Sequence, residues 1–138
     1  MSGGPERALI ARRWVVKAEH DLRMVERGMT GSEDDPLDMV CFHAQQCAEK
    51  YLKAILVARG LDYSRSHDLT LVLASVTAQV PIGLHARDLA VLTRYAAGTR
   101  YPEQPLEVGK SEAEEAVAIT RRVREAARAN LPAAALAD

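Results

Sequence analysis

Near its middle the chain reads Phe42-His43-Ala44-Gln45-Gln46-Cys47-Ala48-Glu49-Lys50-Tyr51-Leu52-Lys53-Ala54, a pattern that predicts an amphipathic helix. Turning each residue by about 100°, as an α-helix does, separates positions 40–56 into an apolar and a polar side. The apolar side holds Val40, Ala44, Cys47, Ala48, Tyr51, Leu52 and Ile55. The polar side holds His43, Gln45, Gln46, Glu49, Lys50 and Lys53. A helix with this pattern buries one face, so we expect the segment to organise the fold.

Phe42 falls among the polar residues of this helix, where a solvated face has no need of an aromatic ring. One interpretation is a second packing surface, such as a dimer interface that also includes Gln46 and Glu49. The other is partial cover of the ring by a loop or by the aliphatic stem of Lys53. Both interpretations stay open at this point.

Helix start and stop signals place four further helices around the central one. The central helix itself is expected from the Asp35-Pro36 start to about Arg59. The others are expected from Pro5 to about Arg27, from the Ser66-His67-Asp68 cap region to about Gln79, from about Leu84 to Ala97, and from the capping box that begins at Ser111 to about Asn130. No alternating run is long enough for a strand. We therefore predict one all-α domain over residues 1–138, an antiparallel up-and-down bundle of about five helices, with a disordered tail from about residue 131.

The composition is that of an ordinary globular domain and excludes a protein that coats nucleic acid by bulk charge. The 138 residues carry a net charge of −1, which is too little positive charge for such coating. Fourteen of the 18 basic residues are arginine, the side chain suited to bidentate contacts with phosphate or carboxylate. Cys41 and Cys47 stand six residues apart on one helix, so they cannot form a disulfide with each other. With no apolar leader or membrane-length run, we expect a cytoplasmic protein with reduced thiols.

Residues 42–54 resemble the central helix signature of the HEPN family, and other landmarks of that family occur in the expected order. These are Trp14, Ala18, Asp21 and Leu22 in the first helix, His67-Asp68-Leu69 at a helix start, and Arg100-Tyr101-Pro102 after the fourth helix. The resemblance implies a helical bundle that dimerises and is often encoded beside a minimal nucleotidyltransferase, as in toxin–antitoxin pairs. It also implies association with a nucleotide or RNA, or toxin-type cleavage of RNA. We expect the homodimer to form through the first and second helices.

Ribonucleases of the family resemble one another in an Arg that is followed, after four to six residues, by a His. In such a pair the His acts as general acid or base and the Arg stabilises the phosphorane charge. Only Arg13 and His20 have this spacing here, and they lie on the first helix, which is not where the family keeps its motif. Arg65 precedes His67 by only two positions. We therefore expect a binding role rather than catalysis, with Arg13 and His20 as the catalytic candidates.

The candidate ligand contacts are polar residues of the central helix and of two loops. They are Lys50, Lys53, Arg65, His67, Arg100 and Tyr101. His67 and Arg65 could hold a phosphate together with the exposed N–H groups of a helix start. Alternatively, His67 and Asp68 cap that helix and fix the preceding loop. In the same way, Arg100 and Tyr101 could contact a phosphate and stack on a base, or their loop could close over the end of the bundle.

The charges of the last helix, acidic at its start and basic at its end, complement the helix dipole and need no ligand. No metal site and no cofactor is expected, because Cys-x-x-Cys and paired Glu-x-x-His motifs are absent from the sequence. Three functions remain. They are a nucleotide- or RNA-associated binding module paired with a nucleotidyltransferase, a metal-independent endoribonuclease toxin acting as a dimer, and a structural helical dimer that docks another protein.

Overall fold

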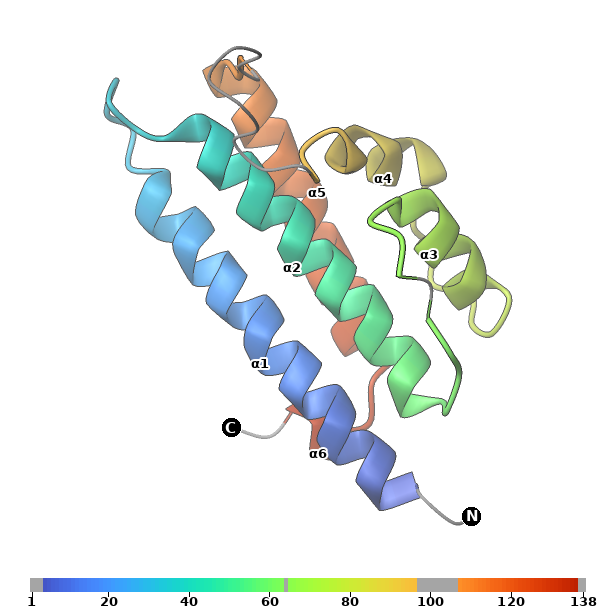
Figure 1. Cartoon of the computed structure of the whole chain (residues 1–138). Coiled ribbons are helices and arrows are strands. Elements are labelled where there is room, and N and C mark those ends of the chain that lie inside the picture. Colours follow the sequence, from blue (N-terminus) through green and yellow to red (C-terminus); the bar gives the residue numbers. More distant parts are fainter. Residues whose placement is uncertain (1–3, 64, 97–106, 137–138) are drawn as a thin grey trace.

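The computed structural model describes residues 4–63, 65–96 and 107–136, and within these ranges every regular element is a helix (Figure 1). The helices are α1 (Gly4–Gly28), α2 (Leu37–Ala58), α3 (Leu69–Thr77), α4 (Ala86–Thr93), α5 (Lys110–Arg128) and α6 (Ala133–Leu136). The prediction of an all-α helical bundle is confirmed. No helix in these ranges is both long and apolar enough to cross a membrane.

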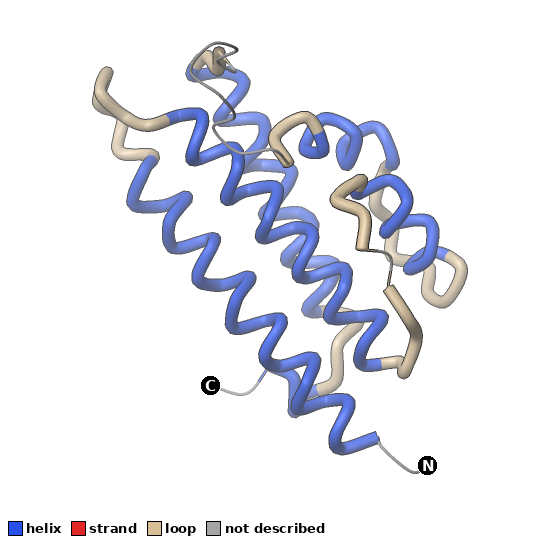
Figure 2. The backbone as a smooth tube through the Cα atoms, in the orientation of Figure 1, coloured by secondary structure: helices blue, strands red, loops and turns tan. Residues whose placement is uncertain are grey.

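α2 lies at the centre of the bundle, with α1 and α5 along its sides and the short helices α3 and α4 against the rest of its surface (Figures 1 and 2). α1 runs antiparallel to α2. α5 runs parallel to α2, because Thr120 contacts Ala44 and Arg128, further along α5, contacts Tyr51, further along α2. α4 lies nearer the end of the bundle at which α2 begins, which is also the end at which α5 begins (Figure 1).

The core is mostly aliphatic and depends on close helix contacts. α2 contributes the buried side chains of Tyr51, Leu52 and Ile55. α1 can approach α2 closely because it presents Ala11 and Ala18, both fully buried, toward it. At the end of α1, a Cβ atom on Gly28 would come within 2.7 Å of the Val40 side chain. Glycine at this position therefore permits the two backbones to meet near the loop that joins them.

Two helix starts differ from the predicted ones. Asp35 does not cap α2; its carboxylate accepts hydrogen bonds from the backbone N–H groups of Thr30 and Gly31, both at 2.8 Å, and closes the preceding loop. α5 begins before the predicted capping box, with Gly109 at the cap position. The N–H of Gly109 donates to the Glu112 carboxylate at 3.2 Å. In both places an acidic side chain accepts hydrogen bonds from backbone N–H groups that have no helical partner. These N–H groups are not the ones that the sequence motifs predicted.

Between α5 and residue 136 the chain packs on the bundle, in the part for which the sequence predicted a disordered tail. Leu131 is buried, and the short helix α6 packs against α1 with Ala135 fully buried. The alanines of this segment allow a one-turn helix to lie close to α1, which supplies the burial that an isolated helix of this length lacks. α4 is shorter than predicted, and Ala97 lies outside the described residues.

Candidate functional site

α2 is buried around most of its circumference, including much of the side predicted to be polar. Gln45, Glu49 and Lys53 are only 0%, 4% and 4% exposed. The segment around Tyr63 and His67 lies over them, which corrects the expectation of a solvated face. One row of half-buried residues stays open along α2, and we call this row the α2 stripe: Met39, His43, Gln46 and Lys50.

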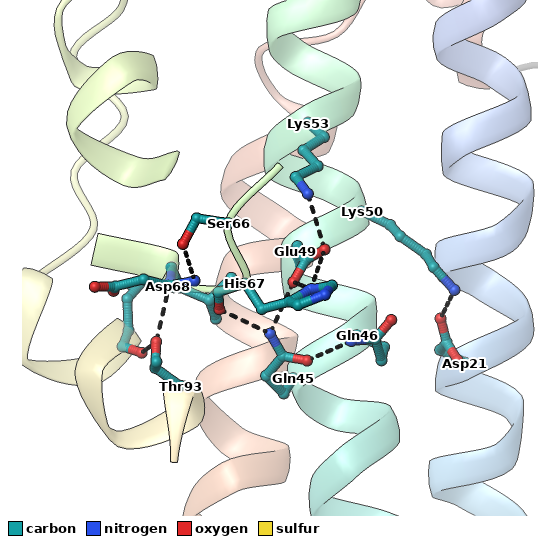
Figure 3. Close-up of polar contacts among 12 residues, drawn as sticks. Asp21, Gln45, Gln46, Glu49, Lys50, Lys53, Ser66, His67, Asp68 and Thr93 are labelled. Carbon is teal, nitrogen blue, oxygen red and sulfur yellow. Dashed lines mark hydrogen bonds and ion pairs between the residues drawn. The ribbon is translucent and has the colours of Figure 1, made fainter. Parts of the chain in front are cut away.

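Glu49 is the centre of a buried polar network beside the α2 stripe (Figure 3). Its carboxylate accepts hydrogen bonds from Lys53 Nζ at 2.9 Å and from Gln45 Nε2 at 3.0 Å. It also lies 2.9 Å from Nδ1 of His67. Burial by itself would raise the pKa of Glu49, but the hydrogen bonds from these three side chains outweigh it and hold that pKa below its ordinary value. The carboxylate therefore stays ionised and fixes Lys53 and His67 in place.

Asp21 holds the α2 stripe from the side of α1. It is 7% exposed, lies 2.8 Å from Nδ1 of His43, and accepts a hydrogen bond from Lys50 Nζ at 2.5 Å. Gln46 donates to Oε1 of Gln45 at 2.6 Å and so connects the stripe with the Glu49 network. Two buried carboxylates on two helices thus position one imidazole ring each.

The start of α3 has its N–H groups occupied by the chain itself. The amide of Asp68 donates to Ser66 Oγ, that of Leu69 to Thr93 Oγ1, and that of Thr70 to the Asp68 carboxylate, each at 3.0 Å. The capping interpretation of Asp68 is therefore confirmed. These three amides are therefore not available to bind a phosphate. The exposed side chain of His67 is the group that a ligand at the start of α3 could contact.

The structure brings part of the predicted ligand set together. Lys50 is part of the α2 stripe and His67 lies beside it, with 24% and 62% of their side chains exposed. Arg65, two residues before His67, is exposed. Arg100 and Tyr101 lie outside the described residues. The candidate site is therefore the α2 stripe together with Arg65 and His67.

Two other predictions for α2 need correction. Glu49 is internal, so it cannot face a second molecule as an interface residue. Lys53 is paired with Glu49, and both side chains are 5% exposed, which removes Lys53 from the ligand set. Phe42 and Gln46 remain half-buried at the surface. The Phe42 ring lies edge-on to that of His43, with 5.3 Å between the ring centres.

Arg13 and His20, the candidates for catalysis, are both exposed on α1 but line different surfaces. His20 lines a hollow with Arg124 and Arg128, whereas Arg13 lines a neighbouring depression with Leu9. No hydrogen bond or ion pair joins either of them to another residue that the structure describes. No contact therefore unites the two as a catalytic pair.

The pairing of Asp21 with His43 is the feature that sequence reasoning missed. The sequence marked Asp21 only as a landmark of the first helix, and it placed His43 on the polar side of the central helix without an arginine at a suitable spacing. The available signal was Asp21 itself, an acidic residue that adjoins the apolar stripe of α1 between Ala18 and Leu22. A buried carboxylate requires a partner, but its partner lies 22 residues away on another helix.

The two thiols are free and buried, so they are poor nucleophiles. Burial raises the pKa of Cys41 to about 11 and raises the pKa of Cys47 as well. Within the described ranges, no group of three or more His, Cys, Asp or Glu side chains could hold a metal ion. The candidate site itself presents the imidazole groups of His43 and His67, the ammonium group of Lys50 and the guanidinium group of Arg65.

These features define a class of protein, an all-α bundle whose central helix carries a polar stripe held by buried carboxylates. The family model of the HEPN domain matches residues 11–130, so the chain belongs to the HEPN family. The crystal structure of TT1696 from Thermus thermophilus is 27% identical, with a TM-score of 0.68. The crystal structure of ST0689, an archaeal HEPN homologue, is 21% identical with a TM-score of 0.66, and supports the fold alone. Each comparison covers 88% of this chain and 98% of the other. None of the curated proteins matches the chain.

Proposed function

We propose that the chain is a HEPN-type binding module that holds a phosphate group of a nucleotide or of RNA against the α2 stripe. One observation carries this proposal: His43 and His67 are each held through Nδ1, by Asp21 at 2.8 Å and by Glu49 at 2.9 Å. A ring held through Nδ1 keeps Nε2 open to a ligand, and in its imidazolium form it donates a hydrogen bond from Nε2 to a phosphate oxygen. The partly exposed Lys50, paired with Asp21 at 2.5 Å, contributes an ammonium group to the same stripe.

We propose further that the module acts as a homodimer beside a nucleotidyltransferase-like partner, as in a toxin–antitoxin pair, in the cytoplasm. Support for the dimer comes from apolar side chains along α1 and α2. Ile10 and Met24 are 44% and 46% exposed and lie on the side of α1 that carries Asp21. Phe42 continues this surface on α2. Two copies that face each other here would bring their α2 stripes together.

The binding proposal is tested with labelled ATP and a labelled single-stranded RNA, each titrated with wild-type protein and with His67→Ala. We expect binding that weakens about tenfold in His67→Ala, since a hydrogen bond to a charged group contributes about 1.5 kcal/mol. His85→Ala, which changes an exposed histidine at the start of α4, is the matched control and should bind like wild type. Absence of binding, or an equal loss in both variants, would exclude this site.

The partner proposal needs a separate experiment. The chain is co-expressed with a nucleotidyltransferase-like protein encoded beside it, and the mass of the purified assembly is measured. Co-purification of the two proteins at a fixed ratio supports the pair. A chain that purifies alone, at any mass, contradicts it. Sedimentation of the chain with Met24→Glu, compared with wild type, tests the homodimer in the same series.

A ribonuclease is the second candidate, and the contact between Asp21 and His43 favours it. A carboxylate that holds Nδ1 of a histidine is the arrangement used to orient a general base. The chain is incubated with labelled RNA in EDTA as wild type, His43→Ala and His20→Ala. Cleavage that disappears only in His43→Ala would make the stripe an active site. Intact RNA in all three samples leaves the binding module as the function.

A further inference from the structure

A groove on the other side of α1 is lined by a cluster of arginines from α1 and α5. Glu19 lies two residues before Asp21, so helix geometry points these two carboxylates to nearly opposite sides of α1. Beside Glu19, side chains of α1, α5 and α6 line a hollow of about 260 Å³, and an adjoining hollow of about 420 Å³ lies along α5. The two hollows share Arg124 and Arg128. We call them together the arginine groove.

The charge of this groove differs in sign from that of the chain. Five arginines line it: Arg12, Arg23, Arg121, Arg124 and Arg128. Two carboxylates, those of Glu19 and Glu125, oppose them, which leaves a surplus of three positive charges. The whole chain has a net charge of −1. The dipole of α5 accounts for basic residues at its end, but it does not account for arginines of α1 that face the same groove.

The inner arginines are held in place and the outer ones are free. Arg124 donates two hydrogen bonds to the Glu19 carboxylate, at 2.7 and 3.0 Å, and Arg128 donates to the hydroxyl of buried Tyr51 at 3.1 Å. Arg12 and Arg23 make no hydrogen bond or ion pair with any residue that the structure describes. Because Arg124 and Arg128 are already held in place, less side-chain entropy is lost when the groove binds a ligand. The unpaired guanidinium groups of Arg12 and Arg23 can then pair with the carboxylates of that ligand.

The walls of the groove are aliphatic, which narrows the class of ligand. Val16 is 41% exposed in the groove, and Leu9 continues the apolar surface at 54%. Leu136 of α6 lines the groove from its other side. Among the described residues that line it there is no Phe, Tyr or Trp and His20 supplies a single ring, so the successive bases of single-stranded RNA find no row of stacking partners here. Aliphatic walls with arginines instead fit an anion that carries apolar side chains.

We propose that the arginine groove docks an acidic amphipathic helix of a partner protein. The apolar face of that helix packs on Val16 and Leu136, and its carboxylates pair with Arg12, Arg23 and Arg121. Charge complementarity carries the choice of occupant. A second copy of this chain is disfavoured, because the same groove on both copies would set like charges against each other. The proposal is independent of the α2 stripe and of its ligand.

The test uses a fluorescein-labelled helical peptide of about 18 residues, with leucines along one face and glutamates beside them. Binding is measured by anisotropy at about 0.15 M salt. We expect the double variant Arg12→Glu/Arg23→Glu to bind about tenfold more weakly than wild type, since attraction becomes repulsion at two positions. The double variant Arg59→Glu/Arg87→Glu makes the same charge change at exposed arginines of α2's end and α4. It should bind like wild type.

Two further ligands test whether the groove binds a purely acidic peptide or RNA in place of an amphipathic helix. A peptide of equal charge with serine in place of leucine should bind about tenfold more weakly, because it loses the apolar contacts. A labelled single-stranded RNA should show no loss in the groove variant. The proposal is overturned if wild type binds no peptide, if both double variants lose affinity equally, or if the serine peptide binds as tightly. It is also overturned if RNA binding, or self-association measured by sedimentation, disappears in the groove variant alone. Thermal unfolding of each variant confirms that it is folded.

Discussion

The α2 stripe and the arginine groove flank the same helix, α1, but they treat charge in opposite ways. In the buried network beside the stripe, Lys53 and Glu49 are paired with each other and 5% exposed. In the groove, Arg12 and Arg23 have no partner among the described residues, and the paired Arg124 is still 36% exposed. A buried ion pair fixes the positions of its two side chains, and removing one partner strongly lowers the free energy of unfolding. Solvent-exposed arginines change that free energy little, and their guanidinium groups remain available to bind another molecule. The buried network beside the stripe therefore keeps its charges paired for stability, whereas the groove keeps part of its charge unpaired and open to a partner.

The largest effect is expected from Glu49→Ala, which leaves the ammonium group of Lys53 buried without a carboxylate. Removing one partner of a buried pair costs about 3–5 kcal/mol in the free energy of unfolding. Urea unfolding followed by circular dichroism measures it. Glu115→Ala, at an exposed position of α5, is the control and should change little. The double variant Glu49→Leu/Lys53→Met should recover most of the loss, and a loss below about 1 kcal/mol for Glu49→Ala would contradict the comparison.

The same carboxylate predicts how stability depends on pH. The pKa values of Glu49 and Glu19 lie below their ordinary 4.5 in the folded chain. Carboxylates of this kind contribute stability above the unfolded-state pKa and lose it as pH falls through the folded-state pKa. The free energy of unfolding should therefore decline below about pH 4.5 in wild type. The Glu49→Gln variant should have a lower free energy of unfolding at neutral pH, and this free energy should decline less steeply as the pH falls. Identical slopes in the two proteins would show that Glu49 does not contribute to the pH dependence.

Asp21→Asn should have a smaller effect than Glu49→Ala. It removes charge-assisted hydrogen bonds to Lys50 and His43, each of which contributes about 1.5 kcal/mol or more. Lys50 is 24% exposed and can turn to water, so we expect a total loss of about 1–2 kcal/mol. Asp88→Asn, which breaks an exposed ion pair with Arg122 at 3.1 Å, is the control. A loss as large as that of Glu49→Ala would contradict this expectation, because it would mean that Asp21 stabilises the fold as strongly as Glu49 does.

The smallest effects are expected in the arginine groove. Arg124→Ala should cost about 1 kcal/mol, since its pair with Glu19 is partly exposed to solvent. Arg12→Ala and Arg23→Ala should each stay within about 0.5 kcal/mol of wild type in urea unfolding. A large loss in either variant would show that the outer arginines support the fold and are not reserved for a partner.

Helix periodicity and start signals were sufficient to predict the helical bundle, because the apolar residues of each helix recur on one face. The role of Asp68 as the N-cap of α3 could also be predicted, because a cap and its helix are adjacent in sequence. The burial of Glu49 and Lys53 was not, because the segment that covers them comes after α2 and periodicity cannot place it. The same limit hid the contacts of Asp21 with His43 and of Glu19 with Arg124, which join residues 22 and 105 positions apart.

The parallel course of α2 and α5 has a consequence for how the chain folds. α1 and α2 are joined by a short loop, so their hairpin closes with a small loss of loop entropy. α5 must reach α2 across contacts such as Thr120 with Ala44, which are 76 residues apart. Local contacts form before distant ones when loop closure limits the rate. We therefore expect the α1–α2 hairpin to act as the folding nucleus and α5 to dock last, which makes the arginine groove the final surface of the molecule to be assembled.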